Sequence, residues 1–314
     1  MYSVHFYGRM IADAPRMEAY AAALRQTVKP DSVVMDLGCG PGVFALLACK
    51  LGARRVYAVE PNNVIGLARE AAVANGFADR IQFFEKLSTE ITLEEPATVI
   101  VSDLRGVLPW FQQHIPSIID ARKRLLVRGG TLIPRRDILW AAVVEAADQY
   151  EELVAPWENR FELDLSAGTR LITNTWRKTR IQPDQMVTEP VCWTSIEYDE
   201  VDSPDVQAEI SWRATRKGTA HGVAAWFDSE LIDGIGFSNH PSGPEMIYGN
   251  GFFPFSQPVD VRQNDRITLR LAAKMVGDGY VWRWDTEFPK TSFKQSTFYG
   301  VPLSKGHLVN LAKP

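Results

Sequence analysis

A glycine-rich turn between two apolar runs contains the residue types that point most directly to chemistry. It reads DLGCGPG, from Asp36 to Gly42, and the carboxylate of Glu60 ends the next apolar run. Glycines at a strand-to-helix turn let the backbone approach a ligand and expose the amino end of the helix. An acid about 20 residues further on can accept both hydroxyl groups of a ribose. The stretch therefore predicts a site for a molecule that contains adenosine.

The spacing of the glycines favours one cofactor for this turn. The pattern is D-x-G-x-G-x-G, which lacks the GxGxxG spacing of dinucleotide-binding folds and places Asp36 before the glycines. A carboxylate there favours a ligand that carries positive charge, such as the sulfonium and ammonium groups of S-adenosylmethionine. NAD binding and a tight turn without a ligand are the alternatives. The residues expected to contact S-adenosylmethionine, and its product S-adenosylhomocysteine, are Asp36, Gly38, Cys39, Gly40, Glu60 and Pro61.

Apolar strands that alternate with helical stretches must position this turn. The strands read VVMDL, RRVYAVE, RIQFFE, ATVIVSD and GGTLIP, and helical patterns lie between them. Continuous apolar strands separated by helices indicate a mostly parallel sheet that is covered on both faces. An amphipathic helix is expected at 10–28. We predict cofactor-lid helices over 1–30 and a Rossmann-like cofactor domain over 31–134.

After Pro134 the pattern changes to short alternating runs with turn signals between them. Runs such as ILWAAVVEA, AEISWRAT, RITLRLAAK and YVWRWDTEF are typical of an antiparallel β domain. We therefore predict a barrel-like substrate domain over 135–314, with a helical arm inserted at about 150–182. The fold class is α/β plus β: a Rossmann-like sheet followed by an antiparallel barrel-like domain.

Composition limits the partners and the location. The net charge is −4 and the sequence pI is about 5.8, so no overall basic field attracts nucleic acid or an anionic membrane. Three cysteines without metal-ligand spacing suit a reducing compartment, and no apolar run approaches the length of a membrane span. We expect a cytoplasmic protein that binds no metal, nucleic acid or membrane.

The segment MIADAPR, from Met10 to Arg16, adds a resemblance to a known family. Together with the glycine-rich turn, it resembles the class I S-adenosylmethionine-dependent methyltransferases and, within them, the protein arginine methyltransferases. The resemblance implies that the Arg16 side chain grips the cofactor carboxylate and that Met10 packs against the sulfonium. It also implies that Leu87 and Ser88 flank the adenine. Tyr7 stands where the family usually has a histidine that contacts the cofactor.

The second half of the chain resembles the same family. GGTLIPRRDILWAAVVEA is similar to the passage from the sheet into the barrel, and HGVAAWFDSEL is similar to a barrel strand before the second active-site loop. APWENRFELDLS falls where the family's dimerisation arm begins. The resemblance therefore implies a homodimer formed through the arm.

The first catalytic loop departs from the family pattern. The family has S-E-W-M-G and a second glutamate nine residues after the first, and the two carboxylates clamp a guanidinium. This chain has SDLRGVLPWFQ, in which Asp103 and Gln112 take the two positions and Arg105 enters the loop. An Arg105 side chain that points inward would oppose a cationic substrate. Asp103 is the candidate catalytic residue, whereas Gln112 and Arg105 are candidates for substrate binding.

The second catalytic loop also departs from the family pattern, which is T-H-W-x-Q. The aligned residues here run from Met246 to Asn250, with Ile247 at the histidine position. Tyr248 and Asn250 could bond a polar ligand, the first as a catalytic residue and the second in substrate binding. Tyr7 is a third catalytic candidate that could bond the substrate or close the lid.

These departures predict a substrate other than peptidyl arginine. Removing one partner of a buried charge pair costs about 3–5 kcal/mol, which is roughly two to four decades in rate. We therefore expect methyl transfer to N or O of a small molecule, amino acid or peptide. The alternatives are methylation of a protein side chain, which an acidic groove around the β domain would favour, and a different displacement at the sulfonium. A protein that keeps the fold only for binding is the non-enzymatic alternative.

Overall fold

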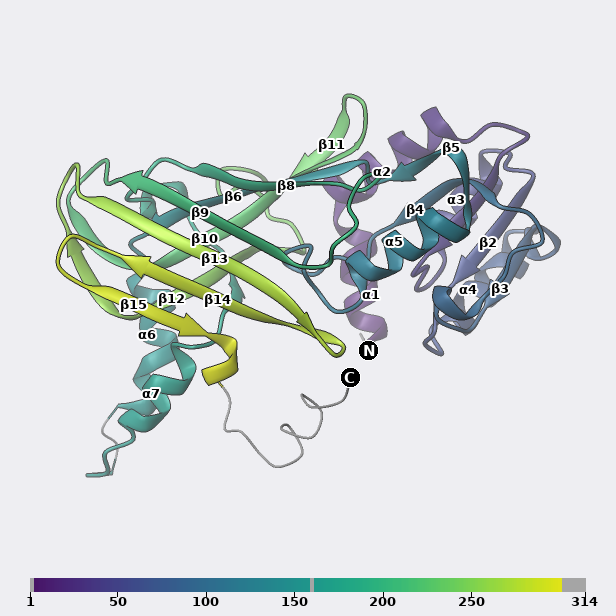
Figure 1. The fold of residues 1–314 in the computed structure, drawn as a ribbon. Coiled ribbons are helices and arrows are strands. Elements are labelled where there is room, and N and C mark those ends of the chain that lie inside the picture. Colours follow the sequence, from purple (N-terminus) through teal and green to yellow (C-terminus); the bar gives the residue numbers. More distant parts are fainter. Residues whose placement is uncertain (1–2, 159–160, 301–314) are drawn as a thin grey trace.

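Five parallel strands form the first unit of the computed structural model, which describes residues 3–158 and 161–300 (Figure 1). The strand order is β3-β2-β1-β4-β5, so β1 lies at the centre and the order in which strands are added reverses between β1 and β4. The strands are β1 Val33–Leu37, β2 Arg55–Val59, β3 Ile81–Phe84, β4 Ala97–Ser102 and β5 Leu126–Ile133.

Helices cover both faces of this sheet because its strands are apolar on both sides. Val34 of β1 packs with residues of α2, α3 and α4, whereas Met35 packs with α5 and with the core of the second unit. Adjacent residues of one strand point to opposite faces, so β1 is buried from end to end. The helices are α1 Val4–Ala12, α2 Ala14–Thr27, α3 Val43–Lys50, α4 Ile65–Ala74 and α5 His114–Arg124, with 3₁₀ turns at Ala78–Arg80 and Ser88–Glu90.

The N-terminal segment forms two helices rather than the single helix expected at 10–28. The helix α1 ends at Ala12, and α2 begins at Ala14 with Pro15 in its first turn. Proline lacks an amide hydrogen and is tolerated only at the start of a helix, so the chain breaks just before it. Asp13 lies at this break.

The second unit consists of two antiparallel sheets that face each other (Figure 1). One sheet has the order β7-β12-β10-β6-β8, with β11 paired to β10, and the other has the order β15-β14-β13-β9. The first sheet comprises β6 Arg136–Val144, β7 Arg177–Thr179, β8 Val191–Glu197, β10 Gly218–Ile232, β11 Ile235–Ser238 and β12 Asn250–Val261. The second comprises β9 Val206–Arg213, β13 Arg266–Val276, β14 Gly279–Glu287 and β15 Ser292–Ser296, and 3₁₀ turns lie at Pro183–Gln185 and Thr297–Tyr299. The predicted fold class is confirmed.

Aromatic side chains fill the space between these two sheets. Trp282 and Trp284 of β14 are buried, and the Phe253 ring of β12 lies 5.3 and 5.4 Å from theirs. The indole nitrogen of Trp284 donates to the carbonyl oxygen of Pro254 at 3.1 Å, which satisfies its polar group inside the core. The two tryptophans therefore belong to the barrel core.

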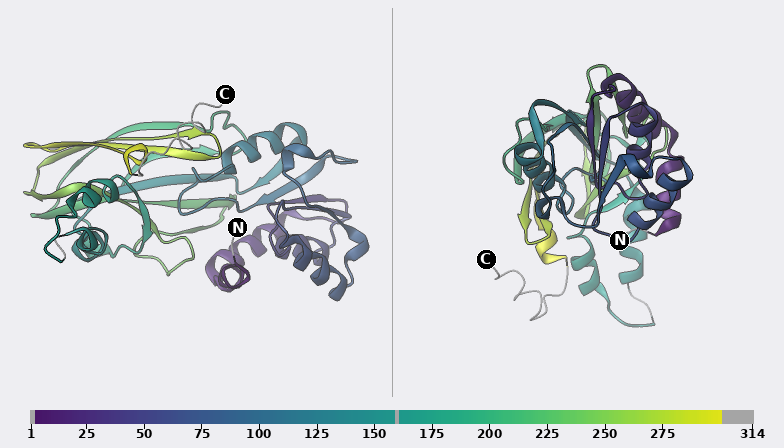
Figure 2. Two further views of the ribbon diagram at one scale, coloured as in Figure 1. Left: turned by 90° about the horizontal axis from the view of Figure 1, so that it is seen from below. Right: turned by 90° about the vertical axis from the view of Figure 1, so that its right-hand side faces the viewer.

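A helical arm projects from the barrel (Figures 1 and 2). It contains α6 Ala147–Val154, a 3₁₀ turn at Ala155–Trp157 and α7 Ser166–Ile172. Residues 159–160, which fall within the predicted arm at about 150–182, lie outside the described part of the chain. Among the helices that are described, none is both long and apolar enough to cross a membrane.

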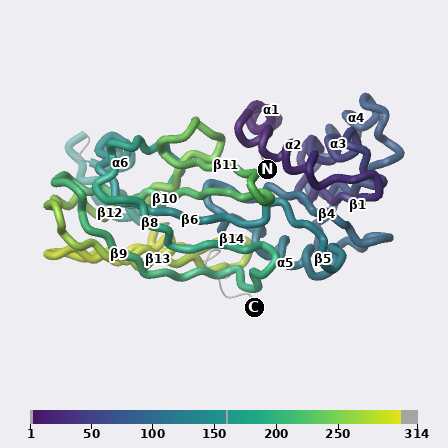
Figure 3. Tube along the Cα trace, turned by 90° about the horizontal axis from the view of Figure 1, so that it is seen from above, coloured from purple at the N-terminus to yellow at the C-terminus, as the bar shows by residue number. Residues whose placement is uncertain are grey.

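The helix α2 joins the two units. Figure 3 shows it beside β11 of the barrel unit, and the two elements are in contact. The ring of Tyr20 stacks on Phe44 of the first unit at 4.5 Å and lies 6.0 Å from Phe237 of the second. The N-terminal helices are therefore held by both units, next to the carboxyl ends of β1 and β4.

Candidate functional site

A cavity of about 450 Å³ opens at the carboxyl ends of the parallel strands. In sheets of this kind, ligands bind where the strand order reverses, and β1 and β4 mark that point here. The cavity contains most of the residues predicted to bind a cofactor. Those that line it are Met10, Arg16, Gly38, Cys39, Gly40, Glu60, Pro61, Leu87 and Ser88.

The glycine-rich turn has the backbone shape that only glycine adopts readily. Gly38 and Gly40 have φ values of +76° and +51°. A Cβ atom on Gly40 would lie 2.9 Å from the ring of Tyr7, and one on Gly38 would overlap Leu104. The predicted lid residue Tyr7 therefore packs directly on the turn and lines the cavity.

Asp36 has a different place from the one expected. Its side chain is buried and does not line the cavity, and it accepts a hydrogen bond from the amide of Ala45 at 2.9 Å. Desolvation raises the pKa of its carboxyl group to about 7, although the bond from Ala45 opposes the shift. Asp36 thus ties β1 to the start of α3. The idea that it faces the positive charge of a ligand is not supported by this geometry.

Glu60 is held ready to accept hydrogen bonds at the wall of the cavity. One carboxylate oxygen accepts from the backbone and side-chain nitrogens of Asn62 at 3.0 and 2.6 Å, and the other accepts from the amide of Gly40 at 3.2 Å. An anchored carboxylate with remaining lone pairs suits the two hydroxyl groups of a ribose. Asn62 is a cavity residue that the sequence reasoning missed, although its place two residues after Glu60 was a usable signal.

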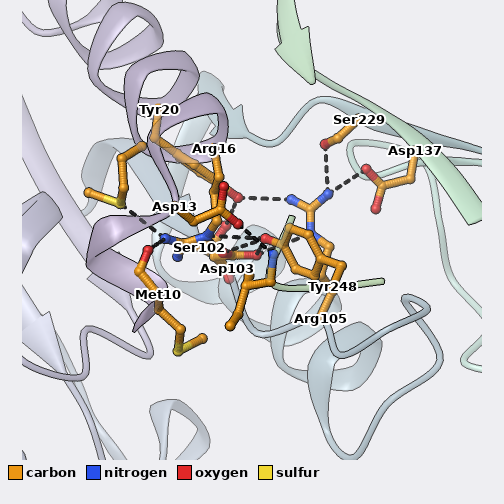
Figure 4. Close-up of polar contacts among 12 residues, drawn as sticks. Met10, Asp13, Arg16, Tyr20, Ser102, Asp103, Arg105, Asp137, Ser229 and Tyr248 are labelled. Atoms are coloured by element: carbon orange, nitrogen blue, oxygen red, sulfur yellow. Dashed lines mark hydrogen bonds and ion pairs between the residues drawn. The ribbon is translucent and has the colours of Figure 1, made fainter. Parts of the chain in front are cut away.

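Arg16 lines the cavity, and Figure 4 shows its guanidinium close to Met10, Asp103 and Tyr248. Its Nε donates to the Asp103 carboxylate at 2.5 Å, and its Nη1 donates to the carbonyl oxygen of Met10 and the sulfur of Met17, both at 3.0 Å. Its Nη2 has no hydrogen bond to the described residues. This nitrogen can therefore receive a ligand carboxylate, the role that the family resemblance gave to Arg16.

The Asp103 carboxylate is 4% exposed, and both of its oxygens are already in contact with other side chains (Figure 4). Arg16 contacts one oxygen, the Nε of Arg105 lies 3.2 Å from the other, and the Tyr248 hydroxyl donates at 2.7 Å. Although burial alone would raise it, Arg16 and Arg105 hold the pKa of the Asp103 carboxyl below its ordinary value. The predicted catalytic acid is therefore ionised, accepts hydrogen bonds from Arg16 and Tyr248, and lies within ion-pair distance of Arg105.

Arg105 turns from the loop toward the interface between the units. Its guanidinium donates to Asp137 at 2.7 Å, to Ser229 at 2.6 Å and to the Tyr20 hydroxyl at 2.8 Å. The side chain is fully buried and lies over the rings of Phe227 and Phe237 at 5.3 and 5.6 Å. Part of the residue still lines the cavity. Its charge is neutralised by acids of the chain, so it does not face a substrate as an unpaired cation.

The network continues from Asp137 to a buried histidine. The Tyr198 hydroxyl donates to Asp137 at 2.7 Å and lies 3.0 Å from the Nε2 of His114. Because Tyr198 gives its proton to Asp137, the Nε2 of His114 carries hydrogen and donates to Tyr198. Burial, and then the charge of Arg105, lower the pKa of His114 to about 3. The sequence reasoning missed Asp137 and His114, since nothing in the local pattern links them to the loop.

The second position of the expected clamp holds no acid. Gln112 lines the cavity and has a φ of +45°, the left-handed region that residues other than glycine rarely adopt. Its amide makes no hydrogen bond to the part of the chain that the structure describes. A neutral amide can accept a hydrogen bond from a guanidinium but cannot balance its charge.

The second catalytic loop divides between two roles. Tyr248 is buried, bonds Asp103 and stacks on Phe237 with a centroid distance of 5.7 Å. Asn250 lies outside the cavity, where it donates to the carbonyl oxygen of Asn239 at 2.8 Å and accepts from the amide of Ile181 at 3.0 Å. Asn250 therefore does not reach a substrate in this cavity, although it lines a second one. Its hydrogen bonds fix the loop instead.

Comparisons with known proteins identify both units. Residues 135–278 match the family model described as the arginine methyltransferase oligomerization subdomain, and residues 20–141 match that of ribosomal protein L11 methyltransferase. A probable protein arginine N-methyltransferase 6 of Arabidopsis thaliana is 27% identical over 94% of this chain and 68% of its own length. Protein arginine N-methyltransferase 2 of Mus musculus is 30% identical over 82% of this chain and 61% of its own length. The chain thus spans about two thirds of the length of these relatives.

Solved structures show the same fold. The Trypanosoma brucei PRMT1 enzyme-prozyme heterotetrameric complex with AdoHcy has a TM-score of 0.85 at 22% identity, covering 94% of this chain and 98% of that one. Protein arginine methyltransferase 10 of Arabidopsis thaliana has a TM-score of 0.81 at 21% identity, covering 94% and 97%. At these identities the likeness establishes the fold alone.

The prediction of a small-molecule or peptide acceptor is wrong. Relatives that match most of the chain are named protein arginine N-methyltransferases. The prediction was based on Asp103 and Gln112. These two residues affect how strongly a guanidinium is bound, but they do not determine the size of the molecule that carries the guanidinium. The positions of Asp103 and Gln112 therefore could not identify the methyl acceptor.

The pairing of Arg105 with Asp137 can be tested by a double-mutant cycle. We expect Arg105→Met and Asp137→Asn each to lower the free energy of unfolding by about 3–5 kcal/mol, because each leaves a buried charge without its partner. The double variant should lose less than the sum of the two. Urea unfolding measures all three, with Arg270→Ala on the exposed face of the barrel as the control that changes little. Additive losses would show that the two residues stabilise the fold independently.

Three observations now converge on one assignment. The parallel sheet holds a cavity that contains a glycine cradle, an anchored acid at Glu60 and an arginine nitrogen available for a carboxylate. The barrel unit matches the arginine methyltransferase model, and relatives of that name cover most of the chain. The chain is a class I S-adenosylmethionine-dependent methyltransferase that resembles the protein arginine methyltransferases.

Proposed function

We propose that this chain methylates arginine side chains of proteins and that it acts as an oligomer assembled through its arm. The observation that carries the proposal is the continuous cavity that runs from Glu60 to Asp103, in a chain whose relatives are named protein arginine N-methyltransferases. A cytoplasmic location, expected from the cysteine content, stays a prediction.

The residues of the cavity fit S-adenosylmethionine, which supplies an electrophilic methyl group when bound. Glu60 would hold the ribose hydroxyls, and the Nη2 of Arg16 would hold the carboxylate. Met10 would lie near the sulfur, with Leu87 and Ser88 beside the adenine. The glycine-rich turn supports this fit, because Gly38 and Gly40 line the cavity with backbone alone.

The residues at the far end of the cavity would orient the acceptor. Asp103 stays ionised and can accept a hydrogen bond from an acceptor N–H while Arg105 and Tyr248 hold it in place. Gln112 can offer its amide oxygen on the other side. A clamp of one acid and one amide would hold a guanidinium more weakly than two acids, so turnover by this chain should be slow.

A second candidate is that the chain supports methylation carried out mainly by a partner subunit. The full engagement of Asp103 by the chain's own donors favours it. So does the similarity to a solved complex described as an enzyme-prozyme heterotetramer.

The arm is the proposed oligomer contact. Trp157, Phe161 and Leu163 expose 41, 90 and 57% of their surface. Apolar side chains are also exposed on the helices of the Rossmann-like unit, where a second chain could cover them; these are Ile11, Leu67 and Val73. Large exposed apolar side chains clustered on a projecting element are typical of an interface. The name of the matched family model, an oligomerization subdomain, supports the same assignment.

The arm contact predicts that charge at its tip weakens association. We expect the oligomer of the double variant Phe161→Asp and Leu163→Asp to dissociate at a protein concentration at least about tenfold higher than the wild type does, since buried interface side chains are each worth about 1 kcal/mol or more. Sedimentation velocity over a dilution series measures this. Tyr299→Asp, an exposed aromatic on the barrel, is the control. Unchanged association of the arm variant would remove the arm from the interface.

Binding of S-adenosylhomocysteine tests the cofactor residues. We expect Glu60→Ala and Arg16→Ala each to weaken binding by about 1–3 kcal/mol, because each removes a charged hydrogen-bonding partner of the ligand. Titration calorimetry measures the change, and Glu70→Ala on the exposed face of α4 should bind as the wild type does. Wild-type affinity in both site variants would refute the assignment of the cavity.

Restoring the second acid tests the acceptor. Gln112→Glu should raise kcat/KM on an arginine-bearing protein segment by at least about tenfold, a part of the roughly two to four decades that a missing partner costs. The transfer of a labelled methyl group measures this, with the exposed Gln26→Glu as the control. If the wild type and Gln112→Glu both bind S-adenosylhomocysteine and neither methylates, the second candidate is favoured instead.

A further inference from the structure

A second cavity, of about 310 Å³, lies between α1, β7 and the loop that leads into β12. Three cationic side chains line it, those of Arg9, Lys178 and Arg180, against a single acid, Glu245. The whole chain carries a net charge of −4, so this pocket is a local exception to an acidic protein. We call it the basic pocket.

Most of this positive charge is not neutralised by the chain. Arg180 pairs with Glu245 at 3.0 Å, and 77% of the Glu245 side chain is exposed. Arg9 makes no hydrogen bond or ion pair with the described residues. The Lys178 amine donates to the backbone carbonyl oxygen of Ile247 and has no acid within ion-pair distance in the same part of the chain. A pocket with two uncompensated cations has a place for an anion.

The surroundings of Lys178 support this conclusion. Desolvation, followed by the charge of Arg9, lowers the pKa of its amine, and the more favourable charges of Glu245 and Asp13 do not offset these effects. Arg9 and Lys178 are close enough to repel each other, and an anion bound between them would lower this repulsion. Geometry and electrostatics thus point to the same ligand chemistry.

His240 adds a hydrogen-bond donor to the pocket wall. Its Nδ1 accepts from the backbone amide of Ser242 at 3.0 Å, so the neutral ring carries its hydrogen on Nε2. The residue also lines the basic pocket. Its Nδ1 also lies 2.7 Å from the Ser242 hydroxyl, so this nitrogen is already engaged by the chain.

The basic pocket shares its wall with the methyl-transfer cavity. On α1, Met10 lines the first cavity and Arg9 the second. On the loop, Tyr248 bonds Asp103, whereas its neighbours Met246 and Gly249 line the basic pocket. A protein segment that enters the first cavity with its acceptor side chain therefore passes close to the basic pocket.

We propose that the basic pocket binds a carboxylate or phosphate group on the protein substrate, next to the side chain that is methylated. This inference rests on the proposed function and deepens it by naming the substrate class. A protein acceptor was expected to go with an acidic groove around the β domain. The basic pocket instead places cationic side chains next to the cavity that would hold the acceptor. A substrate that combines a methylated side chain with a nearby anionic residue follows from that arrangement.

Peptide binding to the protein saturated with S-adenosylhomocysteine tests the proposal without requiring turnover. The probes are peptides that share one arginine and carry alanine, glutamate or phosphoserine at successive flanking positions. We expect the best anionic peptide to bind about tenfold more tightly than its alanine counterpart, the effect of one charge-assisted hydrogen bond. Fluorescence anisotropy measures the affinities, and the glutamate and phosphoserine arms show which anion is preferred.

Variants assign the preference to the pocket. Arg9→Gln and Lys178→Gln should each reduce the preference for the anionic peptide to about twofold or less, whereas Lys274→Gln, exposed on β13, should keep it. Unchanged S-adenosylhomocysteine affinity confirms that the variants fold. Arg9→Gln should bind the alanine peptide as the wild type does, because Arg9 does not line the methyl-transfer cavity.

Several outcomes would overturn the proposal. Equal binding of the anionic and alanine peptides would do so, and so would a preference that survives Arg9→Gln combined with Lys178→Gln. Competition by inorganic phosphate without any difference between the peptides would make the pocket a site for free anions. Failure of the proposed function would give a different result. The anionic peptides would still bind more tightly than the alanine peptide, but none of them would be methylated.

Discussion

The bridge that Asp103 makes between two arginines is the interaction on which the arrangement of the site depends. Arg16 comes from α2, Asp103 and Arg105 follow β4, and Arg105 reaches Asp137 at the start of the barrel. Two cations and two anions balance one another, and each of the four side chains is at most 7% exposed. Because an uncompensated buried charge costs several kcal/mol, the four groups fix how the lid, the sheet and the barrel meet.

This bridge also limits the chemistry of the site. An acid that neutralises two guanidinium groups of its own chain has less negative charge to offer a third. The Tyr248 hydroxyl takes a further lone pair of Asp103, and the neutral Gln112 faces the same cavity. The Asp103 carboxylate thus stabilises the junction between the units, and this leaves it less able to bind a guanidinium of a substrate. Arg105 also pairs with Asp137, so the cation that draws on Asp103 is itself held by the barrel.

The sequence predicted those parts of the structure that local spacing encodes. The glycine-rich turn, Glu60 and the residues from Met10 to Arg16 reach the cavity because a strand-to-helix turn and a lid helix bring them there. Local spacing could not reveal that Arg105 pairs with Asp137, since the fold alone joins a loop of the first unit to a strand of the second.

Asp36 and Asn250 lie outside the first cavity for the same physical reason. The acid of Asp36 and the amide of Asn250 were read as ligand contacts from their sequence neighbours, but each satisfies backbone groups in the interior. A polar side chain beside a motif must first pair the buried polar groups around it, and only what remains can face a ligand. The breaks in the two catalytic motifs were real, but they describe the clamp and not the acceptor.

The loop around Tyr248 connects the charges on both sides of the acceptor site. The Asp13 carboxylate, at the break between α1 and α2, accepts from the amide of Ile247 at 2.7 Å, and Lys178 donates to the carbonyl oxygen of the same residue. The next residue, Tyr248, bonds Asp103. An anion that draws Lys178 away from the loop would therefore act on the backbone beside Tyr248. Lys178 of the basic pocket and Asp103 of the first cavity therefore contact two consecutive residues of one loop, Ile247 and Tyr248.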